Sequence, residues 1–296
     1  MKDQAEKLRN IMEGKNNKKK NSITKNKAKV LAITSGKGGV GKTNFAINLA
    51  ISLKRLGYRV LILDADIGLA NIEILTGTNM NYTIADLIKK DKDIFDIIGE
   101  GPEGLKIISG GSGIYELSMM SDKNINILLD EMEKLEHEMD YIIIDTGAGV
   151  SNVVLDFVMA SDETILITTP DPTSLMDAYT IIKALTTNGY KGKINVVANI
   201  VENRVEANNI FNKLNKVSNN FLDVELFYLG YLQRDNIVNK AVKNQQPFLL
   251  LNPSSNISKK INIMALKFVN PSKHDNLKKS VGFTQKLKEL LFGRGR

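Results

Sequence analysis

The chain has 296 residues, no cysteine and a formal net charge of +7, and hydrophobic residues make up 43% of it. Without cysteine it can form no disulfide, thiolate zinc site or iron–sulfur cluster, which fits a reducing compartment such as the cytoplasm. No run of about 18 apolar residues is available to span a membrane, and the N-terminus lacks the apolar core of a secretory signal. The length and hydrophobic content favour one α/β domain with a full core and short tails.

The positive charge is confined to the two ends of the chain. Residues 1–29 hold ten Lys and Arg against three acids, and residues 271–296 hold seven against two. The rest of the chain therefore carries a net charge of −5. A protein that coats DNA non-specifically shows the opposite distribution, with a basic body. We therefore expect no specific nucleic-acid partner.

The first 26 residues predict a short helix followed by a basic linker. An apolar stripe at helical spacing is formed by Ala5, Leu8, Ile11 and Met12. The polar, lysine-rich stretch from Gly14 to Asn21 has no reason to fold. A helix of about 12 residues that is separated from the core is marginally stable alone. Such an element is either a frayed terminus or a segment kept for a partner.

The stretch from Gly36 to Thr43 matches the phosphate-loop pattern G-x-x-x-x-G-K-[ST]. A β-branched apolar run over residues 30–34 precedes it and a helical pattern follows it, so the loop joins a strand to a helix. Backbone N–H groups of such a loop converge on phosphate oxygens, and the positive end of the helix adds to their field. Lys42 would neutralise the β- and γ-phosphates, and the Thr43 hydroxyl would ligate Mg²⁺. We predict a nucleotide site formed by Gly36, Lys37, Gly38, Gly39, Val40, Gly41, Lys42, Thr43 and Asn44.

A second lysine, Lys37, stands inside the loop, where the general pattern requires none. This variant loop resembles that of the MinD/ParA family of ATPases. The resemblance implies a doubly wound, mostly parallel α/β sheet that binds ATP or ADP with Mg²⁺. In that family the early lysine contacts the nucleotide of the facing subunit in an ATP-bound homodimer, so Lys37 would act in trans beside Lys42. On the local pattern alone, the alternative is an extra solvated lysine next to an anion site.

Two further strand patterns end in acidic residues. The buried-strand pattern over residues 59–63 leads to Asp64 and Asp66, and four apolar residues before Asp145 describe a parallel strand covered on both faces. An open α/β sheet binds its ligand at the carboxyl ends of its strands, where Asp145 would reach the Mg²⁺ shell through water. The resemblance implies that Asp66 positions the attacking water, that Asp64 helps to hold the metal shell, and that Gly147 approaches the γ-phosphate. The alternative is that Asp64 and Asp66 merely cap the strand end.

Candidates for holding the adenine follow two later strands. Asn199 ends the strand pattern that begins at Ile194, and an amide that donates and accepts together suits the adenine edge. The resemblance places an adenine-binding asparagine at this position, with Arg204 beside the base. Asp235 is a candidate for a second adenine contact, although relatives carry a proline near Gln233 that is missing here. The alternative for Asn199 is a strand-end cap.

The N-terminal string Asp3-Gln4-Ala5-x-x-Leu8-Arg9 resembles the activator motif of the FlhG family, also called YlxH or FleN. In that family the motif engages the signal-recognition-type GTPase FlhF, and the glutamine assists GTP hydrolysis there. The resemblance therefore implies a partner-binding set of Asp3, Gln4, Ala5, Leu8 and Arg9.

The last 26 residues predict a polar linker and an amphipathic helix. Apolar side chains follow the spacing i, i+4, i+7 and i+8, with lysines opposite, at Phe283, Leu287, Leu290 and Leu291. With Phe292 and the Leu-Phe-Gly ending, this segment resembles the membrane-targeting helix of the MinD and FlhG families. One copy should bind a membrane weakly, whereas two copies on a dimer should bind far better. The alternative is that the helix folds back onto the core.

Together these patterns predict three segments: a partner-activating helix and linker at 1–26, a MinD-like ATPase domain at 27–270, and a linker with a membrane-targeting helix at 271–296. The resemblance implies a cytoplasmic ATPase that associates reversibly with the inner face of the cell membrane. It would regulate flagellar number or placement by stimulating FlhF, with flagellar basal-body proteins as further candidate partners. Three alternatives stay open: a MinD-type regulator of the division site, a ParA-type DNA segregation ATPase, and a non-catalytic scaffold gated by nucleotide.

Overall fold

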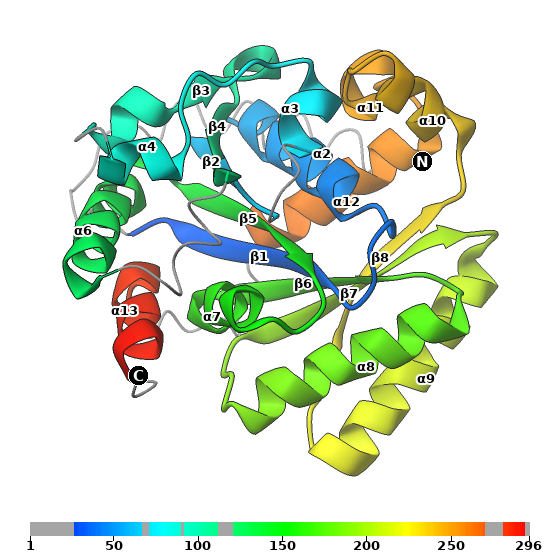
Figure 1. Cartoon of the computed structure of the whole chain (residues 1–296). Coiled ribbons are helices and arrows are strands. Elements are labelled where there is room, and N and C mark those ends of the chain that lie inside the picture. The colour runs from blue at the N-terminus through cyan, green and yellow to red at the C-terminus, as the bar shows by residue number, and fades with distance from the viewer. Residues whose placement is uncertain (1–26, 67–70, 90–91, 112–120, 270–280, 294–296) are drawn as a thin grey trace, which may run out of the picture.

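One sheet organises the described part of the chain, with strands in the order β3-β4-β2-β5-β1-β6-β7-β8 (Figure 1). The computed structural model describes residues 27–66, 71–89, 92–111, 121–269 and 281–293. β3 pairs antiparallel with β4, and the other neighbouring strands are parallel. The strands are β1 (Lys29–Ser35), β2 (Val60–Ala65), β3 (Gly99–Glu100), β4 (Lys106–Ser109), β5 (Tyr141–Ala148), β6 (Glu163–Thr168), β7 (Lys193–Val201) and β8 (Phe227–Gln233).

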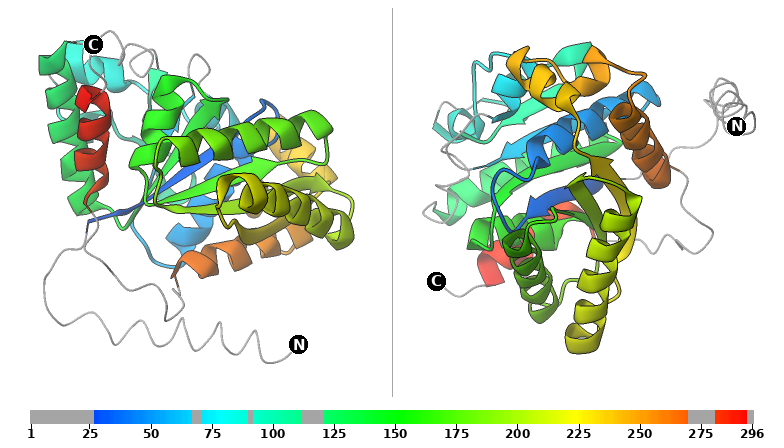
Figure 2. Two further views of the ribbon diagram at one scale, coloured as in Figure 1. Left: turned by 90° about the horizontal axis from the view of Figure 1, so that it is seen from below. Right: turned by 90° about the vertical axis from the view of Figure 1, so that its right-hand side faces the viewer.

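Helices cover both faces of this sheet (Figures 1 and 2). One face packs against α2 (Lys42–Arg55), α3 (Asn71–Thr76), α10 (Asn236–Lys243), α11 (Phe248–Leu251) and α12 (Asn256–Val269). The other face packs against α4 (Ile84–Lys89), the 3₁₀ helix η1 (Ile94–Ile97), α6 (Asp122–Glu138), α7 (Asn152–Ala160), α8 (Pro172–Thr187), α9 (Arg204–Leu222) and α13 (Phe283–Gly293). A second short 3₁₀ helix, η2 (Pro102–Gly104), precedes β4. The predicted doubly wound, mostly parallel α/β fold is confirmed.

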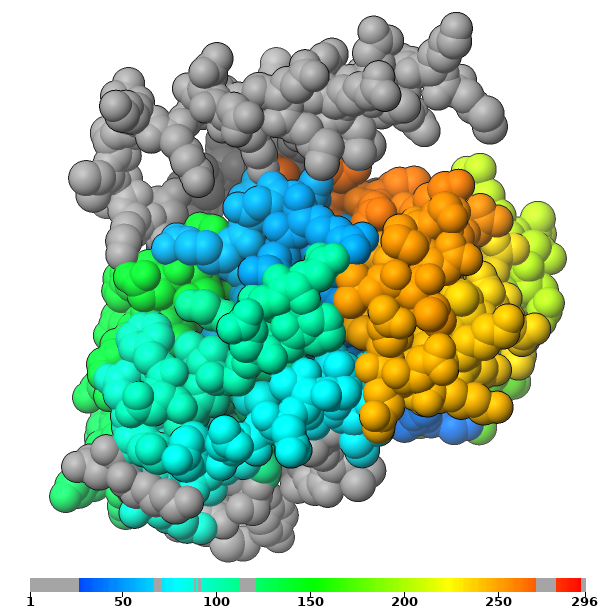
Figure 3. Space-filling model, turned by 90° about the horizontal axis from the view of Figure 1, so that it is seen from above, coloured from blue at the N-terminus to red at the C-terminus, as the bar shows by residue number. Residues whose placement is uncertain are grey.

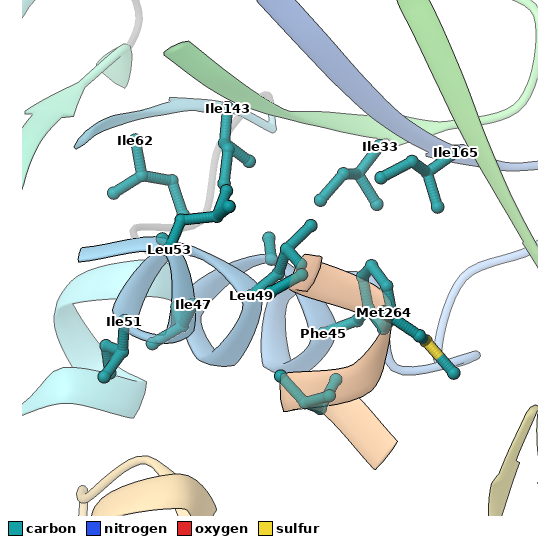
Figure 4. Close-up of a cluster of buried hydrophobic side chains, with 14 of the residues drawn as sticks. Ile33, Phe45, Ile47, Leu49, Ile51, Leu53, Ile62, Ile143, Ile165 and Met264 are labelled. Atoms are coloured by element: carbon teal, nitrogen blue, oxygen red, sulfur yellow. The ribbon is translucent and has the colours of Figure 1, made fainter. Parts of the chain in front are cut away.

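The central strands are apolar along most of their length because both of their faces are buried. In β1, Leu31 and Ile33 face the α2 side, whereas Val30 and Ala32 face the other side, and all four are 0% exposed. Figure 4 shows the first of these two cores, in which sheet residues lie over α2. Its labelled side chains are Ile33, Phe45, Ile47, Leu49, Ile51, Leu53, Ile62, Ile143, Ile165 and Met264. This packing holds α2, and with it the loop that precedes α2, against the carboxyl ends of β1 and β5.

Segments far apart in sequence meet on the surface above α2. Figure 3 shows the gold and orange segment, which includes α10 and α11, side by side with the cyan and teal segment that follows α3. Gly77, with φ of +65°, adjoins this boundary, since a Cβ there would lie 3.2 Å from the carbonyl oxygen of Gln245. The chain therefore closes over α2 from both sides.

Candidate functional site

The loop between β1 and α2 has the conformation of a phosphate cradle. Gly39 and Gly41 have φ of 75° and 90°, a left-handed region that glycine enters without steric cost. Gly41 also forms the N-cap of α2. A Cβ on Gly36 would overlap the backbone of Asp177, so glycine at this position lets α8 pack directly against the loop. The loop therefore presents backbone N–H groups at the positive end of α2.

A buried lysine and a buried aspartate lie behind this loop. Lys42, the first residue of α2, is 7% exposed, and Asp145 of β5 is 0% exposed. Burial raises the pKa of Asp145 to about 6, while the charge of Lys42 and the hydroxyl of Thr43 oppose that rise. The predicted phosphate lysine, metal-binding threonine and strand-end aspartate thus come together.

Asp64 stands beside Asp145 at the ends of neighbouring strands. The two residues occupy facing positions in the register of β2 and β5. Burial and then the charge of Asp145 raise the pKa of Asp64 to about 7, although its carboxylate accepts hydrogen bonds from the backbone of Asp66 and Ile72. Two neighbouring acids that both favour protonation form a site in which added positive charge is stabilising.

The orphaned oxygens of Asp145 fit a divalent cation. Both carboxylate oxygens are buried without a hydrogen-bond partner of normal geometry in the described part of the chain. Such groups are costly unless a partner satisfies them. No group of three or more His, Cys, Asp or Glu able to hold a metal occurs among the described residues. Mg²⁺ commonly uses one or two protein ligands together with water and substrate phosphates, so Thr43, Asp64 and Asp145 suit it.

Asp66 projects from the end of β2 toward Gly147 of β5. Its carboxylate accepts a hydrogen bond of 3.1 Å from the side-chain amide of Asn71. A Cβ on Gly147 would lie 3.3 Å from the other carboxylate oxygen. Asp66 and Gly147 are therefore neighbours at the same edge of the sheet, as their predicted roles require.

Lys37, the second lysine of the loop, forms its contacts within its own subunit. Its ammonium nitrogen donates to the Asp171 carboxylate at 2.6 Å and to the Thr173 hydroxyl at 2.8 Å. Asp171 is the N-cap of α8, and the hydrogen bonds that its carboxylate accepts, first from Lys37 and then from the backbone and hydroxyl of Thr173, lower its pKa. Lys37 therefore points across the loop toward α8 in this conformation.

Beside the loop lies an open cleft of about 370 Å³. It is lined by Lys37, Gly38, Gly39, Val40, Thr169, Pro170, Asp171, Ile200, Glu202, Glu206 and Arg234. The predicted residues Arg204 and Asp235 do not line it: Arg204 begins α9, and Asp235 caps α10 by accepting from the backbone of Ile237 at 3.0 Å. Glu202, Glu206 and Arg234 were not predicted, and the only available signal was their position just after β7 and β8.

Asn199 touches the loop itself. Its side-chain nitrogen donates to the carbonyl oxygen of Val40 at 2.7 Å, and its side-chain oxygen accepts from the backbone N–H of Ile200 at 2.9 Å. The following residue, Ile200, has φ of 58°. Asn199 is therefore brought to the predicted nucleotide site, where it ties β7 to the loop; its contact with adenine stays a prediction.

The predicted membrane helix is α13, and it lies on the domain beside α6 and α7 (Figure 1). Phe283 and Leu287 are 2% and 1% exposed, Leu290 and Leu291 are partly buried in the same core, and Phe292 is 37% exposed. The fold-back arrangement is thus the one observed, and contact with a membrane stays a prediction. None of the helices described is long and apolar enough to cross a bilayer. The predicted partner residues 3–9 lie outside the described part of the chain.

The site has the three features that define a P-loop NTPase. They are a glycine-rich loop from strand to helix, a buried lysine at the start of that helix, and an aspartate at the end of a neighbouring strand. Residues 26–269 match the family model described as ParA, NUBPL iron-transfer P-loop NTPase. The chain belongs to the ParA family. It carries no cysteine with which to ligate an iron–sulfur cluster.

Two relatives at 38% identity have names that refer to flagellar or regulatory roles. The chain is 38% identical over 238 residues to the antiactivator FleN of Pseudomonas aeruginosa, covering 80% of this chain and 85% of that protein. It is 38% identical over 269 residues to the flagellum site-determining protein YlxH of Helicobacter pylori, covering 90% of each. The predicted resemblance to the FlhG type of MinD/ParA ATPase is confirmed.

Solved structures of MinD share the fold. The MinC:MinD cell division complex of Aquifex aeolicus aligns with a TM-score of 0.67 at 22% identity, covering 83% of this chain and 97% of that chain. MinD of Pyrococcus horikoshii complexed with Mg-ADP aligns with a TM-score of 0.64 at 22% identity, covering 82% and 96%. At this identity the likeness establishes the architecture alone.

Proposed function

We propose that this protein is an ATP-hydrolysing molecular switch whose ATP-bound form is a homodimer. The observation that carries the proposal is the convergence of Lys42, Thr43, Asp64 and Asp145 behind a loop that also presents Lys37. Burial raises the pKa of these carboxyl groups when no cation is present. A bound Mg²⁺ would lower their pKa again, so that both would be ionised and could hold the cation beside the phosphates. The chemistry follows from placement and charge, as in other phosphoryl-transfer enzymes.

The residues divide the work between binding and hydrolysis. Lys42 and the loop N–H groups hold the β- and γ-phosphates, and Asp66 orients the attacking water beside Gly147. When bound on Thr43 and the two strand-end aspartates, Mg²⁺ supplies charge neutralisation on the phosphate oxygens. Lys37 leaves Asp171 and reaches the nucleotide of the facing subunit. Each step positions a group or neutralises charge, and none needs a covalent intermediate.

The output of the switch is membrane attachment and control of flagella. Support comes from the two relatives at 38% identity, whose names are antiactivator and flagellum site-determining protein. The amphipathic helix at 283–293 supplies the membrane contact, and residues 3–9 stimulate a FlhF-type GTPase. The protein would then act in the cytoplasm and at the inner face of the membrane, with the ATPase core bounded near residues 27 and 270.

A MinD-type regulator of the division site is the second candidate, because the chain is 31% identical over 251 residues to a relative whose name refers to MinD and to septum site determination, covering 83% of this chain and 74% of that protein. Deleting residues 1–12 separates the two. A flagellar regulator loses its stimulation of FlhF GTP hydrolysis with that deletion, whereas a division-site regulator shows no such stimulation to lose.

The main test combines phosphate release with vesicle sedimentation. Wild type, Asp66→Ala and a chain that ends before Pro271 are each mixed with anionic vesicles in ATP or ADP. ATP should promote sedimentation of wild type, Asp66→Ala should sediment with ATP without turning it over, and the truncated chain should stay in the supernatant. Equal sedimentation in ATP and ADP would contradict an ATP-gated membrane switch. If wild type hydrolyses no ATP even with vesicles and partner present, the protein is a non-catalytic scaffold gated by nucleotide.

A further inference from the structure

Both ends of the described chain meet on one buried carboxylate, that of Glu136 in α6. Glu136 is 0% exposed. One of its oxygens accepts hydrogen bonds from the backbone N–H and from the hydroxyl of Thr284, the latter at 2.8 Å. The other oxygen lies 3.1 Å from the ammonium nitrogen of Lys27. Glu136 thus joins the root of the N-terminal segment to the first turn of α13.

The same region holds the backbone of both ends. The N–H of Ala28 donates to the carbonyl oxygen of Glu136 at 2.7 Å. A Cβ on Gly282 would lie 2.7 Å from both the Glu136 carboxylate and the Lys27 ammonium group. The chain before α13 therefore passes directly over the ion pair, and neither end can move without exposing it.

Beyond this junction, α13 is held mainly by apolar contacts. The Phe283 ring stacks on that of Phe157 with centroids 6.3 Å apart, and Leu287 is 1% exposed. Lys286 adds an ion pair with Asp162 at 3.2 Å. Figure 2 shows α13 alongside α6. These apolar contacts of α13 do not involve the N-terminal segment. The contacts of Glu136 with Thr284 and Lys27 are therefore the part of the docking site that can respond to that segment.

A buried carboxylate is stable only when its partners are present. If Lys27 leaves while α13 stays docked, Glu136 keeps its desolvation cost without its cation. If α13 leaves, water reaches Glu136, and Lys27 is no longer needed to neutralise it. Each partner therefore stabilises the other, and this coupling is reciprocal.

We propose that Glu136 is a positioning residue that couples the two ends of the chain, so that drawing Lys27 away from it loosens the docking of α13. Its consequence rests on the proposed function: a partner that captures residues 3–9 and pulls on Lys27 promotes exposure of the membrane helix. The two elements that the sequence assigns to different partners then act through one carboxylate.

The coupling between Lys27 and the docking of α13 can be measured by the rate at which an introduced thiol is labelled. Because the chain has no cysteine, each introduced cysteine is its only thiol. Leu287→Cys reports opening of α13, and Ile51→Cys, at a site 0% exposed in α2, reports global unfolding. Lys27→Ala and Glu136→Gln are each combined with either thiol. Lys29→Ala is the matched control, since Lys29 also pairs with an acid, Glu163 at 2.6 Å, but not with Glu136.

Lys27→Ala and Glu136→Gln should speed thiol labelling at position 287 by about 5- to 100-fold, the range of typical coupling free energies. Labelling at position 51 should stay unchanged, and Lys29→Ala should leave both rates unchanged. Equal rates at position 287 in wild type, Lys27→Ala and Glu136→Gln would overturn the proposal, as would a parallel rise at position 51.

Reciprocity gives a second measurement that needs no membrane or nucleotide. Thr284→Val removes the hydroxyl donor to Glu136, so hydrogen exchange of the Ala28 amide should accelerate; unchanged exchange would overturn the coupling. Binding of Lys27→Ala to phosphatidylglycerol vesicles in ATP then tests the consequence. Faster labelling at position 287 without stronger vesicle binding supports the coupling and overturns its link to membrane attachment.

Discussion

Asp64 and Asp145 face one another across β2 and β5, and the charge of Asp145 adds to burial in raising the pKa of Asp64 to about 7. Burial raises the pKa of Asp145 itself to about 6. The site that we propose for Mg²⁺ and phosphate therefore holds destabilising negative charge at neutral pH when no ligand is bound. This relationship links function to the stability of the nucleotide-free protein.

Lowering the pH should stabilise the nucleotide-free protein through these two groups. Their folded pKa values lie above the ordinary value of 3.8, so the folded chain keeps protons that the unfolded chain releases. The resulting destabilisation is absent below about pH 4, grows as the pH rises, and is complete above about pH 7. Asp64→Asn should raise the free energy of unfolding at pH 8 by about 1–3 kcal/mol and should have less effect at pH 5.

Urea denaturation at pH 5 and pH 8 measures this difference. Asp130→Asn on the exposed side of α6 is the control, and it should leave the pH dependence of wild type unchanged. An Asp64→Asn protein with the same pH dependence as wild type would mean that Asp64 is ionised at little cost in the fold.

Gly36→Ala should destabilise the nucleotide-free protein, because the added Cβ overlaps the backbone of Asp177 in α8. Overpacking of this kind costs about 1–3 kcal/mol, which corresponds to a fall in Tm of several degrees. Gly38→Ala is the matched control in the same loop, since a Cβ there meets no described heavy atom within 4 Å. Thermal unfolding without nucleotide compares the two, and equal melting temperatures would show that α8 and the loop separate freely.

Asp66→Ala should lower the rate of ATP hydrolysis by about 100- to 10,000-fold if the carboxylate orients or deprotonates water. ATP affinity should change little, because the phosphates are held by the loop and Lys42. Asn71→Ala removes only the 3.1 Å hydrogen bond to the Asp66 side chain and should cause a smaller loss. Phosphate release at saturating ATP gives the comparison, and a loss of ATP binding in Asp66→Ala would place that residue in binding instead.

The parts of the site that depend on local sequence could be predicted, whereas those that depend on distant packing could not. Spacing and apolar runs alone predict the loop, its lysines and the strand-end aspartates. They do so because neighbouring residues in the sequence determine whether the local structure is a strand, a turn or a helix. The pairing of Lys37 with Asp171 joins residues 134 positions apart. It exists because α8 packs on Gly36, which no pattern in the loop reveals.

The same distinction applies to the adenine region, where the roles of Arg204 and Asp235 stay predictions. A side chain that follows a strand turns with the local backbone, which the sequence pattern does not give. Arg204 begins α9 and Asp235 is the N-cap of α10, and neither lines the cleft. The helix α9 (Arg204–Leu222) was not predicted at all. Its polar residues, Asn above all, are poor helix formers, and its stability comes from packing on β7 and α8.

Asp171→Asn should strengthen ATP-dependent dimerisation, because it frees Lys37 for the facing subunit. The two side chains are 44% and 42% exposed, so the ion pair is weak, and the gain should be no more than about fivefold. The gain should shrink at high salt. Analytical ultracentrifugation with Asp66→Ala as background, to prevent hydrolysis, measures the dissociation constant. Lys37→Ala should abolish the gain, and a weaker dimer in Asp171→Asn would show that Asp171 is needed at the interface.

Asn199→Ala should lower the affinity for ATP and GTP to a similar extent. Both polar atoms of this amide are engaged within the chain, one by the carbonyl oxygen of Val40 and the other by the N–H of Ile200. Removing them frees the loop that holds the phosphates, which are common to both nucleotides. Arg204→Ala, at the exposed start of α9, is the control and should change neither affinity. Calorimetric titration with each nucleotide gives the ratio, and a loss confined to ATP would instead establish that Asn199 turns from the loop to read the adenine edge.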